Sequence, residues 1–107
     1  MGKYLCQATY TSEGTKGVVK GGGGTARRTA IQQSLQSLGG KLEALYFAFG
    51  DTDVYLIVDA PDNVSVAAFS LAAAASGAVA VKTTVLLTPE EIDQAVKKSV
   101  PYSPPGR

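Results

Sequence analysis

The stretch over residues 48–58 constrains the fold most, because a short polar turn there leads directly into a continuous apolar run. The run over 54–58 is apolar on both faces of an extended chain, as is typical of a strand at the centre of a sheet. The turn over 50–52 contains glycine and aspartate and is short enough to form a hairpin. We therefore predict a central hairpin between a strand over 41–49 and a strand over 53–60.

The residues before this hairpin predict one strand, one loop and one helix. Alternating side chains indicate a strand over 3–11. The connection over 12–24 is rich in glycine, and residues 16–20 within it could form a turn of helix. Four consecutive glycines hold neither helix nor strand well, so we expect residues 21–24 to be a flexible loop. Three apolar residues at helical spacing then predict a helix over 26–38. These residues are Ile31, Leu35 and Leu38.

The residues after the hairpin predict a helix, a strand and a terminal helix. A helix over 62–75 is rich in alanine, and a strand over 79–87 follows it. The sequence Thr-Pro-Glu-Glu over 88–91 has the threonine, proline and glutamate that start a helix with a capping box. We expect one domain over 1–100 and an exposed, proline-rich tail over 101–107.

The order of these elements is β-α-β-β-α-β followed by a helix. It predicts an α+β, ferredoxin-like fold, in which two helices cover one face of a four-stranded antiparallel sheet and a C-terminal helix follows. The other face carries apolar side chains, which are unfavourable in water over a large area. We therefore expect the protein to bind itself as a homodimer or a higher homo-oligomer.

The composition excludes several classes of function. The 107 residues carry a net charge of +1, so nucleic acid is not an expected partner. The sequence has no histidine, and we expect no metal and no cofactor. We expect no membrane-spanning segment and no signal-like apolar core at the start, which predicts a cytoplasmic protein. The single cysteine, Cys6, is compatible with a reducing compartment and is expected to be a buried apolar residue.

Several short motifs along nearly the whole chain resemble one family. They are YT (10–11), EGTKG (13–17), LGGKLE (38–43), YFAFG (46–50), DV (53–54), APD (60–62), ASGAV (75–79), KTT (82–84) and LTPEE (87–91). As a set, they are similar to the GYD domain family of small bacterial proteins. This chain keeps Gly50 and Asp53 of the motif that names the family, but has Thr52 where the tyrosine usually stands.

The resemblance implies a fold of the dimeric α+β barrel type, in agreement with the order of the elements. It implies no established activity. Wider relatives of that fold include cofactor-free monooxygenases, isomerases and haem enzymes, so the fold alone does not decide the function.

The glycine run and the residues after it form the first candidate ligand site. Arg27 and Arg28 lie in the first turn of a predicted helix, where the helix dipole favours anions over cations. An anion held by these arginines and by the helix that Thr25 caps would offset that cost. The alternative is a mobile loop with two solvated arginines whose stems cover Ile31.

A second candidate set consists of Tyr46, Asp53 and Tyr55. Phenol and carboxylate groups could line a pocket and orient a small ligand. The alternatives are packing of the tyrosines in a core or interface, and a purely structural turn at Asp53. We thus predict an uncharacterised homo-oligomer that binds a small molecule, with an anion as one candidate, or acts as an accessory protein. The alternatives are a cofactor-independent monooxygenase or isomerase and a purely structural oligomer.

Overall fold

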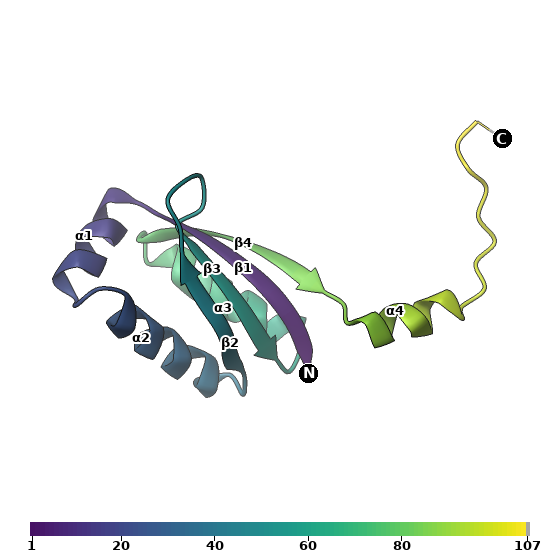
Figure 1. Cartoon of the computed structure of the whole chain (residues 1–107), viewed down its shortest axis with the longest axis horizontal. Helices are drawn as coiled ribbons and strands as arrows, with labels where there is room; N and C mark the ends of the chain where they lie inside the picture. Colours follow the sequence, from purple (N-terminus) through teal and green to yellow (C-terminus); the bar gives the residue numbers. More distant parts are fainter. Residues whose placement is uncertain (107) are drawn as a thin grey trace.

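The computed structural model describes residues 1–106 and contains four strands and four helices (Figure 1). In chain order, these are β1 (Gly2–Tyr10), α1 (Ser12–Lys20), α2 (Gly24–Ser37), β2 (Lys41–Phe47), β3 (Val54–Ala60), α3 (Asn63–Ala75), β4 (Val79–Leu86) and α4 (Pro89–Val96). This order confirms the predicted α+β class with its β-α-β-β-α-β core and C-terminal helix. Helix α1 is an addition to the predicted elements.

The four strands form one antiparallel sheet in the order β2-β3-β1-β4. The central strand β3 is the apolar run seen in the sequence, and besides Ala60 at its end three of its apolar side chains are buried against the helices. These are Val54, Leu56 and Val58. They pair with Ala8, Cys6 and Tyr4 of β1, which therefore face the same side. The predicted hairpin is present, with a longer connection than expected, because β2 ends at Phe47 and β3 begins at Val54.

Two helices cover this side of the sheet and complete the core. Figure 1 shows α3 behind the sheet and α2 along its β2 edge. Ile31 and Leu35 of α2 and Val66 of α3 are buried against the strands, as the helical spacing predicted for the first two. Cys6 is fully buried in the same cluster, and desolvation there raises the pKa of its thiol.

The connection over 12–24 is more helical than predicted, because only a turn of helix over 16–20 and a flexible loop over 21–24 were expected there. Ser12–Lys20 forms α1, which begins where the Thr11 hydroxyl accepts a hydrogen bond from the backbone N–H of Gly14. The break between α1 and α2 is confined to the following glycines. Gly22 and Gly23 have φ values of 98° and 84°, which side chains disfavour.

A β-bulge between Leu42 and Ala44 changes which side chains of β2 face the helices. Strict alternation would place Leu42 and Tyr46 on one face of the sheet. Instead, Leu42 pairs with Val58 and Leu45 with Leu56, so both leucines pack against the core on the helix side. Tyr46 pairs with Tyr55 on the opposite side.

That opposite side, called the open face below, is left uncovered by helices within residues 1–106 (Figure 1). The strand registers arrange its side chains in rows across the sheet. One row consists of Tyr46, Tyr55, Gln7 and Lys82, and the next consists of Ala44, Ile57, Leu5 and Thr84. At the end of the face, Lys3 forms ion pairs with Asp59 (2.8 Å) and Glu43 (3.2 Å). The face therefore has apolar side chains in its middle and charged ones at its edges.

The residues after β4 extend away from the body and are called the C-terminal arm (87–106). Every residue from 89 to 106 is exposed, including the predicted tail from Pro101 to Gly106. Arg107, the last residue of that predicted tail, lies outside the described residues. The molecule measures 56 × 33 × 22 Å with a radius of gyration of 16.9 Å, against about 13 Å for a compact domain of this length.

Asp62 caps α3, and its contribution to stability is expected to depend on pH. Its Oδ1 accepts a hydrogen bond of 2.8 Å from the backbone N–H of Ser65, which lowers the pKa of Asp62 from its ordinary value of 3.8. Because the folded pKa lies below the unfolded one, the stabilisation is complete above pH 3.8 and is lost as the pH falls through the folded pKa. We expect Asp62→Ala to lower the melting temperature at pH 7, and this difference from the wild type to shrink below pH 3.8.

Thermal unfolding followed by circular dichroism across this pH range would measure both effects. Asp51→Ala is the matched control, because the Asp51 side chain makes no hydrogen bond or ion pair within residues 1–106. A difference for Asp62→Ala that stays constant with pH would contradict the role of the ionised carboxylate.

Candidate functional site

A groove runs between α2 and α3, above the helix side of the sheet, and has a volume of about 730 Å³. We call it the helix groove. Its floor is made of apolar strand residues, among them Ala8, Val54 and Leu56. Its walls consist largely of small side chains, including Ala30 from α2 and Ala72 from α3. Because small side chains leave space between two helices, the groove follows directly from the alanine-rich sequence of α3.

One end of the helix groove is closed by α1. The ionisable side chains that line the groove lie at this end. Tyr10, Glu13 and Arg27 line this end. Glu13 also forms an ion pair of 3.5 Å with Lys16, which offsets part of its charge. Arg27 is half-buried and has no carboxylate within 4.0 Å among residues 1–106. The groove is thus mainly apolar and has one arginine in its lining, an arrangement that suits an apolar molecule with an anionic end.

Thr25, Arg28 and Tyr46 lie elsewhere, at a shallow pocket of about 300 Å³ between the start of α2 and the end of β2. Consecutive residues on a helix point in directions about 100° apart, so Arg27 and Arg28 do not face the same space. Thr25 is not the cap of α2, because the helix already begins at Gly24 and Gly23 is its N-cap.

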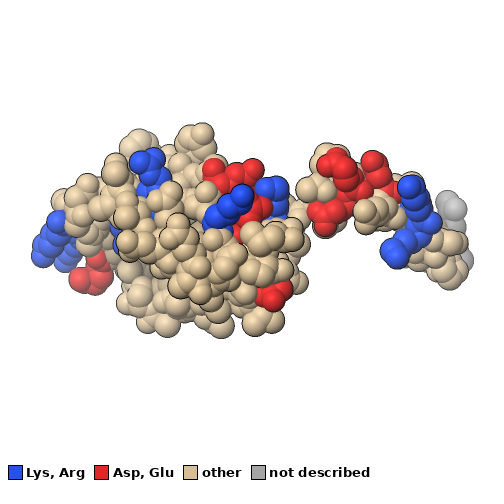
Figure 2. All heavy atoms as spheres, turned by 90° about the horizontal axis from the view of Figure 1, so that it is seen from below, with Lys and Arg blue, Asp and Glu red and all other residues tan. Residues whose placement is uncertain are grey.

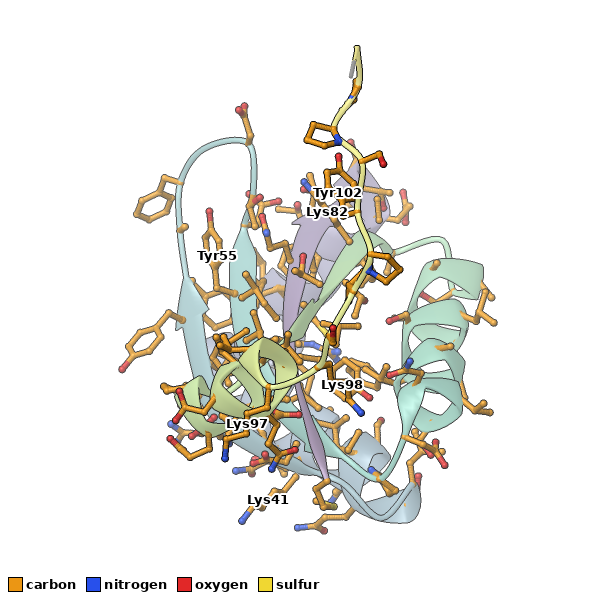
Figure 3. The ribbon with its side chains drawn as sticks, turned by 90° about the vertical axis from the view of Figure 1, so that its right-hand side faces the viewer. Lys41, Tyr55, Lys82, Lys97, Lys98 and Tyr102 are labelled. Atoms are coloured by element: carbon orange, nitrogen blue, oxygen red, sulfur yellow. The ribbon has the colours of Figure 1, made fainter. Side chains whose placement is uncertain are left out.

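Asp53 and Tyr55 are also separated from the helix groove. The carboxylate of Asp53 accepts a hydrogen bond of 2.8 Å from the backbone N–H of Tyr10, and its own backbone N–H donates to Ala8 O at 2.9 Å. Asp53 therefore fastens the β2–β3 connection to the end of β1. Tyr55 lies on the open face beside Tyr46, on the side of the sheet away from α3 (Figure 3).

The six residues predicted from the sequence therefore do not form one site. Arg27 alone among them lines the helix groove within residues 1–106. Sequence reasoning missed Glu13 and the small residues of the walls. Glu13 could have been found from its place in the motif at the start of α1. The alanines and serines could not, because nothing in the sequence indicates that such a residue faces a cavity.

The part of the chain that the structure describes has no cluster of three or more histidine, cysteine, aspartate or glutamate residues that could hold a metal ion. None of the helices within residues 1–106 has the length and apolar character that crossing a membrane requires.

The fold and the groove place the chain among ferredoxin-like α+β domains with a cavity between the sheet and its helices. The sequence model of the GYD domain family matches residues 4–96. The chain belongs to this family, and the match runs from β1 to the end of α4. Neither the search of curated proteins nor the search of solved structures gave a match.

Proposed function

We propose that this GYD domain protein is a bacterial, cytoplasmic homo-oligomer that binds a small apolar molecule with one anionic group. The observation that carries the proposal is the helix groove, where an apolar space of about 730 Å³ has Arg27 among its lining residues. A cavity of this volume suits a ligand with tens of non-hydrogen atoms at most. The apolar part of the ligand lies over the floor of the groove, and its anionic end meets Arg27.

The charge of the ligand follows from the state of Arg27. A half-buried guanidinium without a carboxylate partner within residues 1–106 is only partly hydrated. A carboxylate or phosphate that enters the groove gains a charge-assisted hydrogen bond from this group. A neutral molecule of the same shape gains only the apolar contacts.

The experiment compares octanoate with octanol, two probes that share an apolar chain and differ in charge. We expect octanoate to bind the wild-type protein more tightly, and Arg27→Ala to weaken its binding about tenfold, the effect of one hydrogen bond to a charged group. Isothermal titration calorimetry at fixed salt would measure both dissociation constants.

Arg28→Ala is the matched control, because Arg28 lies at the shallow pocket beside β2 and not in the helix groove. It should leave octanoate binding unchanged. Equal binding of octanoate and octanol, or an equal loss in the two arginine variants, would contradict the assignment to Arg27.

The alternative of a cofactor-independent monooxygenase or isomerase has less support. Its candidate residues would have to meet at one substrate, but Tyr46 and Tyr55 lie on the open face, whereas the carboxylate of Asp53 is engaged by the backbone of Tyr10. A purely structural oligomer is the conclusion if the calorimetry finds no binding in the groove.

A further inference from the structure

Helix α4 is too short and too exposed to be stable without a partner. It has eight residues, fewer than the length at which isolated helices form in water, and all of them are exposed. Its start is nevertheless strongly specified, since Thr88 and Glu91 form a complete capping box. The capping box favours a helix at this position. Because a helix this short is unstable alone, it must be stabilised by packing against another surface.

The C-terminal arm has an apolar stripe that is not buried against the body of the molecule. Ile92 and Val96 are one helical turn apart and are 46% and 77% exposed. Leu87, which precedes the cap and is 59% exposed, is at the position that packs on Ile92 in a hydrophobic staple. Side chains arranged in this way dock an amphipathic helix on an apolar surface.

The connection to β4 directs this stripe away from the chain's own sheet. Strand β4 ends at Leu86 and α4 begins at Pro89, so two residues join them. The arm continues outward from the end of β4 and leaves the body (Figure 1). The surface that receives α4 is therefore one on another molecule.

Two uncovered surfaces of the body could receive the arm, and their charges distinguish them. Helix α3 has an exposed apolar side, with Leu71 at 70% exposure, but it contains no charged residue. Figure 2 shows a broad area of the body without charged side chains, and shows the acidic and then the basic side chains along the arm. The acidic residues of α4 are Glu90, Glu91 and Asp93, and an uncharged surface would leave them without partners.

The open face offers both the apolar contact and the opposite charge. Leu5 and Ile57 lie in its middle row, beside the exposed rings of Tyr46 and Tyr55. At its two edges, Lys41 and Lys82 form no ion pair within residues 1–106. We propose that α4 of one copy docks on the open face of a second copy, with Ile92 and Val96 against the apolar row and its carboxylates near the free lysines.

In a two-fold symmetric dimer, α4 of the second copy also docks on the open face of the first copy, so the two chains exchange arms. This inference rests on the self-association that is part of the proposed function, and it is independent of ligand binding in the helix groove. It assigns the contact to a specific helix and a specific face.

The first test measures the dimer of the full chain by sedimentation equilibrium. We expect Ile92→Asp to raise the dissociation constant of the dimer at least about tenfold, as for other central apolar contacts in interfaces. Gln94→Asp adds the same charge two residues further along the helix, on the side away from the stripe, and should change the constant less than about twofold. Circular dichroism would check that both variants keep the fold.

The second test needs no variant. Equal amounts of unlabelled and ¹⁵N-labelled protein are unfolded together, refolded so that the two kinds of chain pair at random, and treated with a carbodiimide, which joins carboxylates to nearby lysines. Mass spectrometry should find α4 peptides joined to peptides containing Lys41 or Lys82, in mixed isotope pairs. A dimer that persists in Ile92→Asp, or crosslinks that join only chains of the same isotope, would overturn the arm exchange and leave another mode of self-association open. A monomeric wild-type protein would overturn self-association altogether, whatever the calorimetry shows for the groove.

Discussion

We expect Gly14→Ala to lower the free energy of unfolding by about 3 kcal/mol, the upper range for an added methyl group in a packed site. Gly14 is buried in α1, and a Cβ there would clash with the carbonyl oxygen of Ala78. That oxygen belongs to the backbone and already accepts a hydrogen bond of 2.9 Å from the N–H of Thr11. Relief of the clash therefore requires α1 to move away from the start of β4.

Gly17→Ala is the matched control for this prediction, since it makes the same change one turn further along α1. A Cβ at Gly17 has no neighbour within 4 Å, so the alanine brings only its higher helix propensity. We expect a gain of about 0.5 to 1 kcal/mol. Urea unfolding of the two variants would measure both values, and a change of the same sign and similar size in both would show that the contact with Ala78 does not govern this site.

The second large effect is expected for Leu35→Ala, with a loss of about 3 to 4 kcal/mol. Leu35 is 1% exposed and is among the largest fully buried side chains of the core, where α2 packs on the sheet. Its removal forfeits the transfer free energy of the side chain and leaves a cavity that rigid strands cannot fill. A loss of this size is a large part of the total stability of an ordinary domain.

Leu71→Ala provides the comparison, because it removes the same atoms from a leucine of α3 that is 70% exposed. We expect its unfolding free energy to stay within about 0.5 kcal/mol of the wild type. Chemical unfolding at a protein concentration held constant would measure both variants. Equal losses at the two positions would be inconsistent with the core described above.

The strands and the main helices could be predicted because their signals are local. The apolar run of β3, the spacing of Ile31 and Leu35 in α2, and the cap of α4 by Thr88 each depend on neighbouring residues. Helix α1 could not be predicted in this way. Its two glycines lower helix propensity, yet Gly14 is required by the close approach to Ala78. The contact that justifies this glycine comes from a part of the chain far along the sequence.

The candidate site was predicted only in part, for two physical reasons. Adjacent arginines look like one cationic cluster in a sequence, but the helix turns Arg27 into the groove and Arg28 toward β2. The bulge in β2 likewise separates Tyr46 from Leu42, which strict alternation would keep on one face. The groove itself is defined by small side chains from several elements, and no single stretch of sequence carries a signal for it.

The position of β1 in the sheet has a consequence for biosynthesis. Of the four strands of this sheet, β1 is translated first, and its two neighbours are β3, which ends at Ala60, and β4, which ends at Leu86. Until both have been translated, the nascent chain exposes unpaired edges of its most apolar strands. We therefore expect the domain to fold in one late step, after most of the chain has emerged, and to depend until then on chaperones that shield such edges.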